Sequence, residues 1–132
     1  VLEHSRRPRH MRALPGATVT RRLDNRTCGD WVELSLRIGE GVIREAAFTG
    51  EGCALAIAGA DLYCGTVTGR TVEEAARLGH DFRAALEGDG AAAARIAATP
   101  AGCLLAAREF PGRKGCVALA WEGICESGAG LP

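Results

Sequence analysis

The sequence predicts an α+β fold in which helices pack on one face of a small antiparallel sheet of three strands. Two observations support this prediction. Residues up to about 50 alternate between apolar and polar at the period of a β-strand, and residues after 53 are rich in alanine and leucine in helix-length runs. Strands that precede helices, rather than alternate with them, are typical of the α+β class.

Three strands are predicted, at 18–23, 31–38 and 42–49. In the second strand apolar residues occupy every other position (Val32, Leu34, Leu36 and Ile38), as expected of a strand buried on one face. Ala46 and Phe48 should share the buried face of the third strand. The connection at 39–41, Gly-Glu-Gly, is short, and a turn of this length predicts antiparallel pairing.

Helices are predicted at 54–67, 71–87, 91–98, 99–108 and 114–126. Thr71 and Glu74 have the spacing of a capping box, in which each side chain satisfies a backbone amide of the other residue. Gly88 and Gly90 end this second helix. Pro100 is placed at the first position of the fourth helix, where its missing amide hydrogen costs nothing.

Length and composition limit the class of protein. The chain has 132 residues, so we expect one domain over 1–132 with an N-terminal segment at 1–16. The first residue is Val, which leaves open whether other residues precede it. The formal net charge is zero, which gives no basis for a nucleic-acid partner.

Membrane and secretory segments are not expected either. No run reaches the ~18 apolar residues of a membrane span, and no secretory signal is recognised near the start. Six cysteines would suit disulfides in a small secreted protein. A chain with long helical stretches and no signal peptide fits a reducing cytoplasm better.

Three cysteines lie beside glycine at the ends of predicted elements: Cys28, Cys53 and Cys116. Asp30 follows Cys28 by two residues. Three thiolates and one carboxylate form a suitable tetrahedral set for zinc. The chain has no Cys-x-x-Cys pair, however, and a free cysteine often packs as a small hydrophobic residue, so spacing alone leaves both interpretations open.

The strings around these cysteines add a more specific indication. They read Asn25-Arg26-Thr27-Cys28-Gly29-Asp30, Phe48-Thr49-Gly50-Glu51-Gly52-Cys53-Ala54-Leu55-Ala56 and Phe110-Pro111-Gly112-Arg113-Lys114-Gly115-Cys116-Val117-Ala118-Leu119-Ala120-Trp121. In this order they resemble the SufU-type branch of the iron–sulfur assembly family related to IscU and the NifU N-terminal domain. His4, Pro8 and Arg9 look like the end of the family's N-terminal helix. The long stretch between the second and third strings resembles an insertion of the SufU branch.

The resemblance implies a SufU/IscU-like fold and a zinc-dependent sulfur acceptor. Such a protein takes persulfide sulfur from a cysteine desulfurase of the SufS type and passes it to downstream scaffold proteins for iron–sulfur cluster assembly. The implied zinc ligands are Cys28, Asp30, Cys53 and Cys116. The implied sulfur acceptor is Cys28, whose position on a loop before Gly29 suits approach by a partner.

Asp30 and a further candidate, Arg113, each have a simpler alternative role. Asp30 could cap the entry to its strand. Arg113, three residues before Cys116, could offset the negative charge of the ligand set or bind a partner's anion, but it could also form an ordinary surface pair.

One departure from the family pattern concerns the residue before the last cysteine, which is commonly Lys or His. Here it is Gly115, and Lys114 lies one position earlier.

The other cysteines, the histidines and the tryptophans are expected to pack or to lie at the surface. Core packing is predicted for Cys64, Cys103 and Cys125. Surface or packing positions are predicted for His4, His10 and His80, and packing for Trp31 and Trp121. Two further functions stay open: a scaffold on which an iron–sulfur cluster is assembled, and a structural zinc domain whose Cys28 is unreactive.

Overall fold

The computed structural model describes residues 6–25, 29–109 and 114–122, with the backbone alone at 107–109. The elements follow in the order β1 (Val19–Asn25), β2 (Asp30–Gly39), β3 (Val42–Glu51), α2 (Ala54–Val67), α3 (Val72–Leu86), α4 (Gly90–Ala97), η1 (Pro100–Glu109) and α5 (Lys114–Val117). Strands come first and helices second, which confirms the α+β prediction.

The sheet has the order β1-β2-β3, and both neighbouring pairs are antiparallel. All three predicted strands are confirmed, although the first and third run two residues further, to Asn25 and Glu51. The β2–β3 turn has a positive φ at Glu40 (53°) and at Gly41 (75°). Positive φ at both central residues matches the right-handed twist of the strands it joins, so the turn fixes the register of the pair.

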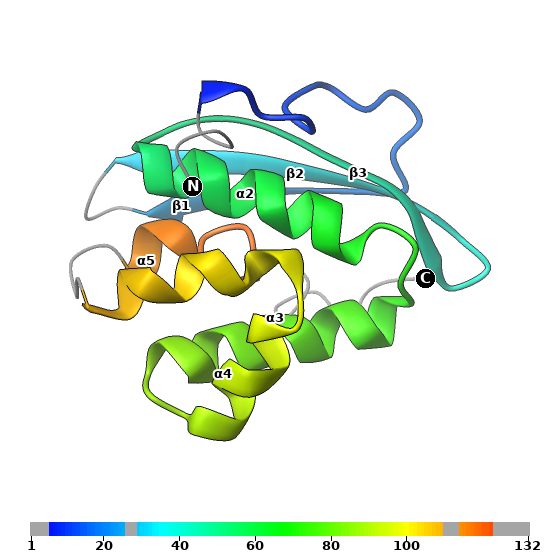
Figure 1. Cartoon of the computed structure of the whole chain (residues 1–132). Coiled ribbons are helices and arrows are strands. Elements are labelled where there is room, and N and C mark those ends of the chain that lie inside the picture. The colour runs from blue at the N-terminus through cyan, green and yellow to red at the C-terminus, as the bar shows by residue number, and fades with distance from the viewer. Residues whose placement is uncertain (1–5, 26–28, 110–113, 123–132) are drawn as a thin grey trace.

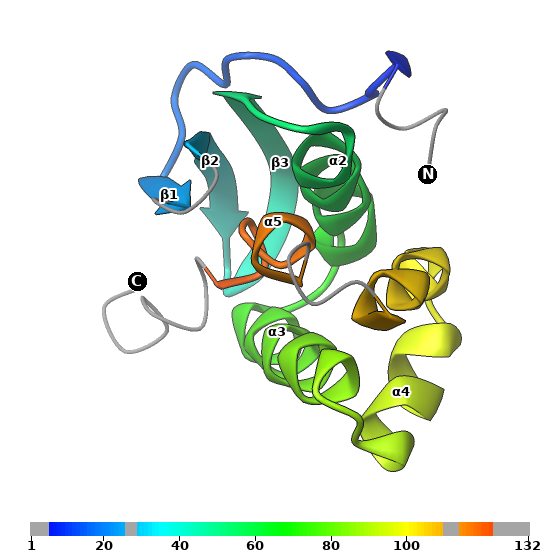
Figure 2. The ribbon, with the colours of Figure 1, turned by 90° about the vertical axis from the view of Figure 1, so that its left-hand side faces the viewer.

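One face of the sheet is covered by α2, as two views at right angles show (Figures 1 and 2). Val32, Leu34 and Leu36 are buried on this face, as the alternation predicts. Ala46 and Phe48 are buried too, but so is Ala47 between them. The N-terminal segment accounts for this difference, because the amide of Phe48 donates to the carbonyl of His10 and 12–15 border a hollow on the opposite face.

The helices form a layer on the α2 side of the sheet, with α3 and α4 further from the strands (Figure 2). The predicted helix at 54–67 is confirmed at both ends, and α3 and α4 begin and end within one residue of their predicted bounds. The capping box at Thr71 and Glu74 is present. The predicted helix at 99–108 is instead a 3₁₀ helix. No helix in the described ranges is long and apolar enough to cross a membrane.

The prediction of a final helix over 114–126 is wrong in its described part. Helix α5 ends at Val117, and turns follow up to Trp121, while 123–126 lie outside the described residues. Every residue from Cys116 to Trp121 is buried. Backbone hydrogen bonds after Cys116 span three residues, as from the amide of Trp121 to the carbonyl of Ala118, so the segment continues as tight turns that carry the Trp121 ring into the core.

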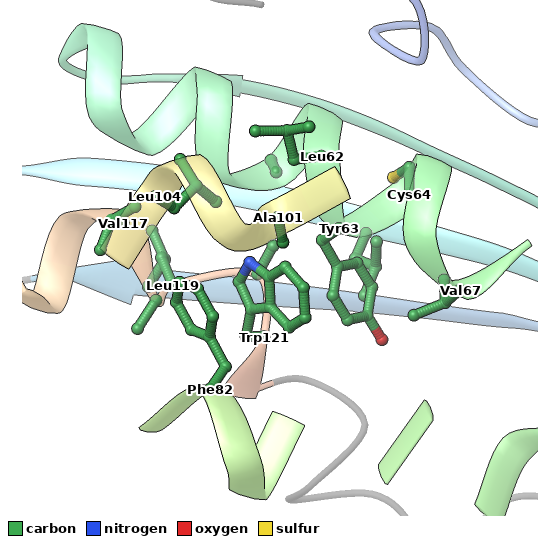
Figure 3. Close-up of a cluster of buried hydrophobic side chains, with 14 of the residues drawn as sticks. Leu62, Tyr63, Cys64, Val67, Phe82, Ala101, Leu104, Val117, Leu119 and Trp121 are labelled. Carbon is green, nitrogen blue, oxygen red and sulfur yellow. The ribbon is translucent and has the colours of Figure 1, made fainter. Parts of the chain in front are cut away.

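Trp121 anchors this turn in the core, which confirms its predicted packing role (Figure 3). Its ring stacks on Phe82 at 4.3 Å between centroids and meets Tyr63 edge-on at 5.1 Å. The indole N–H donates to the carbonyl of Gly59 at 3.2 Å. These contacts hold the segment that carries Cys116 against α2.

Candidate metal centre

Three of the four predicted ligands come together in space. The ligand atoms of Asp30, Cys53 and Cys116 all lie within 4.8 Å of one another. Asp30 and Cys116 are buried, and Cys53 is half-buried. The starts of β2, α2 and α5, which carry these residues, gather at one edge of the molecule, on the left in Figure 1.

Sheet register brings the first two ligands together. Asp30 begins β2, and its neighbour Trp31 pairs with Glu51 at the end of β3. Cys53 lies two residues beyond Glu51 and is the N-cap residue of α2. The antiparallel pairing therefore places the start of α2 beside the Asp30 carboxylate.

The Asp30 carboxylate contacts Cys53 through both oxygens. Its Oδ1 accepts a hydrogen bond from the backbone amide of Cys53 at 3.2 Å, and the Cys53 thiol donates to Oδ2 at 3.6 Å. A carboxylate at the start of α2 is also favoured by the helix dipole. Asp30 thus bonds to the N-cap residue of α2, and its role as a metal ligand stays a prediction beside a purely structural one.

Gly52 leaves room for this arrangement. A Cβ atom at residue 52 would lie 2.9 Å from Cγ of Asp30 and 3.0 Å from its Oδ1. Contacts that short do not occur, so the carboxylate would have to move. The Gly-Cys sequence at the β3–α2 junction is thus a requirement of the site's geometry.

One distance among the three candidate ligands suits a tetrahedral zinc ion. With Zn–S of about 2.3 Å and Zn–O of about 2.0 Å, a sulfur and an oxygen ligand lie about 3.5 Å apart. The 3.6 Å between Cys53 Sγ and Asp30 Oδ2 agrees with that separation. Two thiolates and a carboxylate leave one position of a tetrahedron for a further ligand.

Cys28 and Arg113 lie outside the described residues, as do His4 and Cys125. The residue after Cys28 is described: Gly29 has a φ of 74°, and its amide donates to the carbonyl of Asn25 at 2.8 Å. Asn25 itself pairs with Asp30 across the β1–β2 ladder. The roles of Cys28 as ligand and acceptor and of Arg113 as a charge partner stay predictions.

Asn25 belongs to the site, and sequence reasoning gave it no role. Its side-chain amide donates to Sγ of Cys116 at 3.6 Å. The residue stands in the same string as Cys28, three positions earlier, but nothing in the sequence shows that residues 25 and 116 meet. Lys114, in contrast, is directed toward α3, where its ammonium lies 3.9 Å from Glu87. The pair borders a surface hollow of about 570 Å³ that Gly115 also lines.

The remaining described cysteines lie apart from the centre. Cys64 is fully buried, which confirms core packing, and burial raises the pKa of its thiol far above the usual value. The prediction that Cys103 packs in the core is wrong, because its side chain is exposed. In the 3₁₀ helix the buried positions are Ala101, Leu104 and Leu105, and Cys103 falls on the other side.

The predicted packing and surface positions of the other residues hold. His80 is exposed, and His10 is half-buried with its backbone amide bonded to Asp61. Trp31 is half-buried, and the guanidinium of Arg22 lies 4.3 Å from the centre of its ring. Neither histidine approaches the three ligands as a fourth member of the described cluster.

Comparisons with known proteins agree with this fold. The model of the NifU-like N-terminal domain matches residues 1–116. An iron–sulfur cluster assembly scaffold protein IscU from Streptococcus pyogenes is 33% identical over 96% of this chain and 79% of its own length. The zinc-dependent sulfurtransferase SufU from Bacillus subtilis is 27% identical over 94% of this chain and 83% of its own length.

Solved structures share the fold. A SufU from Fervidobacterium islandicum, described as a putative iron–sulfur cluster assembly scaffold protein, superposes with a TM-score of 0.81 at 22% identity, covering 92% of this chain and 88% of that one. A NifU-like N-terminal protein from Brucella abortus gives 0.79 at 18% identity, covering 95% and 86%. Because the family model matches most of the chain, this protein belongs to the family of NifU-like N-terminal domains.

Proposed function

We propose that this chain is a zinc-dependent sulfur acceptor that takes persulfide sulfur from a cysteine desulfurase and passes it on for iron–sulfur cluster assembly. The observation that carries the proposal is the convergence of Asp30, Cys53 and Cys116 on one point. The likeness to a protein named as a zinc-dependent sulfurtransferase supports the choice of metal and of reaction.

Cys28, Asp30, Cys53 and Cys116 would hold the zinc ion. When bound, zinc stabilises the ionised form of the thiols at neutral pH. Asp30 and Cys53 are fixed by the contacts at the start of α2, and Cys116 by the buried turn that ends at Trp121. Cys28 precedes a glycine with positive φ on the connection between β1 and β2, so it is the candidate for the ligand that exchanges.

The chemical step is a thiol–persulfide exchange at Cys28. Its thiolate attacks the outer sulfur of the persulfide on the desulfurase cysteine and forms a new S–S bond. The old S–S bond breaks, and the desulfurase cysteine leaves as a thiolate. Cys28 then carries the persulfide, and no net oxidation or reduction occurs. Arg113 would offset the negative charge of the ligand set or bind an anionic group of the partner.

The partner in this proposal is a SufS-type cysteine desulfurase, and the recipients are downstream scaffold proteins. Because free thiols stay reduced in the cytosol and tend to form disulfides in oxidising compartments, the cytoplasm is the proposed location.

The test combines metal analysis with sulfur mapping. The purified chain should contain about one zinc ion. After incubation with a cysteine desulfurase and cysteine, mass spectrometry should find one added sulfur on Cys28. Cys28→Ala should abolish stimulation of cysteine turnover, whereas Cys103→Ala, at the exposed cysteine away from the site, should not. Sulfur found only on Cys103, with Cys28→Ala fully active, would sink the proposal. An unreactive Cys28 in a zinc-loaded chain would indicate a structural zinc domain.

A second candidate is a scaffold for iron–sulfur cluster assembly. It is favoured by the likeness to a protein named as an IscU scaffold at 33% identity, and thiolates also suit iron–sulfur clusters. Anaerobic incubation with iron, cysteine, desulfurase and a thiol reductant, which reduces the persulfide sulfur to sulfide, distinguishes the two. A scaffold should develop the visible absorption of a cluster in amounts equal to the chain, whereas a zinc-loaded sulfur acceptor should keep its zinc and stay colourless.

A further inference from the structure

We propose that Asn25 is a positioning residue of the metal centre: its amide donates a hydrogen bond to the Cys116 sulfur, and Gly115 is what makes room for it. This inference rests on the proposed function, because it concerns how the same ligand set is held. Its consequence is that Cys116 is kept as a resident ligand while Cys28 exchanges.

The contact between Asn25 and Cys116 is direct. Nδ2 of Asn25 lies 3.6 Å from Sγ of Cys116, which is within hydrogen-bonding range for sulfur. A thiolate only accepts hydrogen bonds, so the amide N–H₂ group is the end of the side chain that should face it. Groups that hydrogen-bond to a ligand fix its orientation and moderate its charge.

The backbone of Asn25 is held on two sides, so its side chain starts from a fixed point. Asn25 ends β1, where it pairs with the ligand Asp30. Its carbonyl accepts the amide of Gly29 at 2.8 Å and so closes the connection that contains Cys28. A donor carried by a sheet positions its partner better than one carried by a loop.

Gly115 leaves the amide of Asn25 undisturbed beside the sulfur. A Cβ atom at residue 115 would lie 3.3 Å from Nδ2 of Asn25, so the amide would have to shift by a few tenths of an ångström. Lys114 directs its charge toward Glu87 on α3. Gly115 therefore contributes space, and Asn25 at the end of β1 contributes the donor.

The arrangement predicts how substitutions at the two positions combine. Asn25→Ala removes the donor, and we expect zinc affinity to fall by about 10- to 100-fold. Asn25→Asp keeps the shape but replaces the donor with a negative charge beside a thiolate, so the loss should be greater. Gly115→Ala should weaken binding by displacing the amide, and the double variant Asn25→Ala/Gly115→Ala should bind zinc as Asn25→Ala does, because only one interaction is there to lose.

The experiment measures zinc affinity by competition with a chromophoric chelator, and the sulfur-to-metal absorption of the cobalt-substituted chain. Asp24→Ala is the matched control, since Asp24 is the exposed neighbour on β1 and pairs with Arg22. It should leave affinity and spectrum unchanged, whereas Asn25→Ala should shift the absorption as well as lower affinity. A role in packing alone would tolerate the isosteric Asn25→Asp and leave the spectrum as in the wild type.

The outcomes separate this inference from the proposed function. If the wild-type chain binds zinc and accepts sulfur, but Asn25→Ala retains full affinity and an unchanged cobalt spectrum, the role of Asn25 is wrong and the proposed function stands. Additive losses in the double variant would also overturn it. If Asn25→Ala behaves as expected but Cys28 accepts no sulfur, the positioning role stands and sulfur transfer fails. A wild-type chain that binds no metal would overturn both.

Discussion

At Gly52, immediately before Cys53, any side chain would meet the carboxylate of Asp30. A Cβ atom there would lie 2.9 Å from Cγ of Asp30 and 3.1 Å from the Cβ of Ala56. One neighbour is the candidate ligand Asp30 and the other is Ala56 in helix α2. Moving either of them to make room for a Cβ atom would cost free energy. At the scale of single residues, the site therefore depends on the lack of a side chain at Gly52 as well as on the side chains that could bind the metal.

We therefore expect Gly52→Ala to weaken zinc binding by about tenfold or more, because the carboxylate moves away from the thiolates. Chelator competition on the purified variant measures this. The control is Gly90→Ala at the start of α4, where a Cβ atom would meet nothing within 4 Å. Equal affinities for the two variants would show that Asp30 is not a ligand or that it adjusts freely.

At the scale of elements, the packing of α2 against the segment after Cys116 positions this third candidate ligand. The two approach so closely that a Cβ atom on Gly59 would lie 2.4 Å from the carbonyl oxygen of Val117. The hydrogen bond from Trp121 to the carbonyl of Gly59 closes the same contact from the other end. Gly59 thus allows a backbone approach that locates Cys116.

Gly59→Ala should lower the free energy of unfolding by about 1–3 kcal/mol, as overpacking does in other cores. It should also weaken zinc binding, because Val117 is the residue next to Cys116. Gly65→Ala in the same helix is the matched control, since its Cβ would only touch the His10 side chain at 3.4 Å. There, replacing glycine in a helix should leave stability unchanged or raise it by about 0.5–1 kcal/mol. Chemical denaturation of the metal-free chains tests both expectations.

The capping box of α3 adds a pH dependence. Hydrogen bonds from the backbone and side chain of Thr71 lower the pKa of Glu74 below its ordinary value. A carboxylate with a lowered folded-state pKa stabilises the fold above its unfolded pKa, and this contribution disappears as the pH falls through the folded value. The melting temperature of wild type should therefore exceed that of Glu74→Gln at pH 7, and the difference should shrink below about pH 4.5.

Thermal denaturation of the metal-free chains between pH 3 and pH 7 measures this difference. Thr71→Ala should cost about 1 kcal/mol at neutral pH through loss of the cap. A gap between wild type and Glu74→Gln that stays constant down to pH 3 would contradict the assignment.

At the scale of the whole molecule, the three candidate ligands come from parts of the chain that are far apart in sequence. Asp30 comes from the sheet, Cys53 from the junction of sheet and helices, and Cys116 from the last described helix. A metal ion bound by all three would link the two layers of the domain. Its binding free energy would then add to the stability of the fold.

Removal of zinc should therefore lower the melting temperature by roughly 10 °C or more, given a ligand concentration about 1,000 times the dissociation constant. The measurement compares thermal melts before and after chelation, with elemental analysis to verify loss of the metal. Readdition of zinc should restore the original melt. An unchanged melt after verified removal would mean that the site is not part of the fold's stability.

The sequence by itself determined the strands and most helix bounds. These depend on local properties: the period of apolar residues, the two-glycine turn at 39–41, and the capping residues Thr71 and Glu74. The same local logic failed for 114–126 and for Cys103. In the first case the backbone turns so that Trp121 is buried in the core. In the second, the chain forms a 3₁₀ helix, which leaves Cys103 on the exposed side.

Only the tertiary structure decided which distant residues meet. The strings around residues 30, 53 and 116 suggest a shared site, but their convergence depends on strand register and on the close approach of α2 to the segment after Cys116. The role of Asn25 depends on the same packing, because its partner lies 91 positions away. Local sequence sets the conformation of each segment, whereas contacts between segments arise only when the core packs, and the three candidate ligands and the Asn25 amide are held by such contacts.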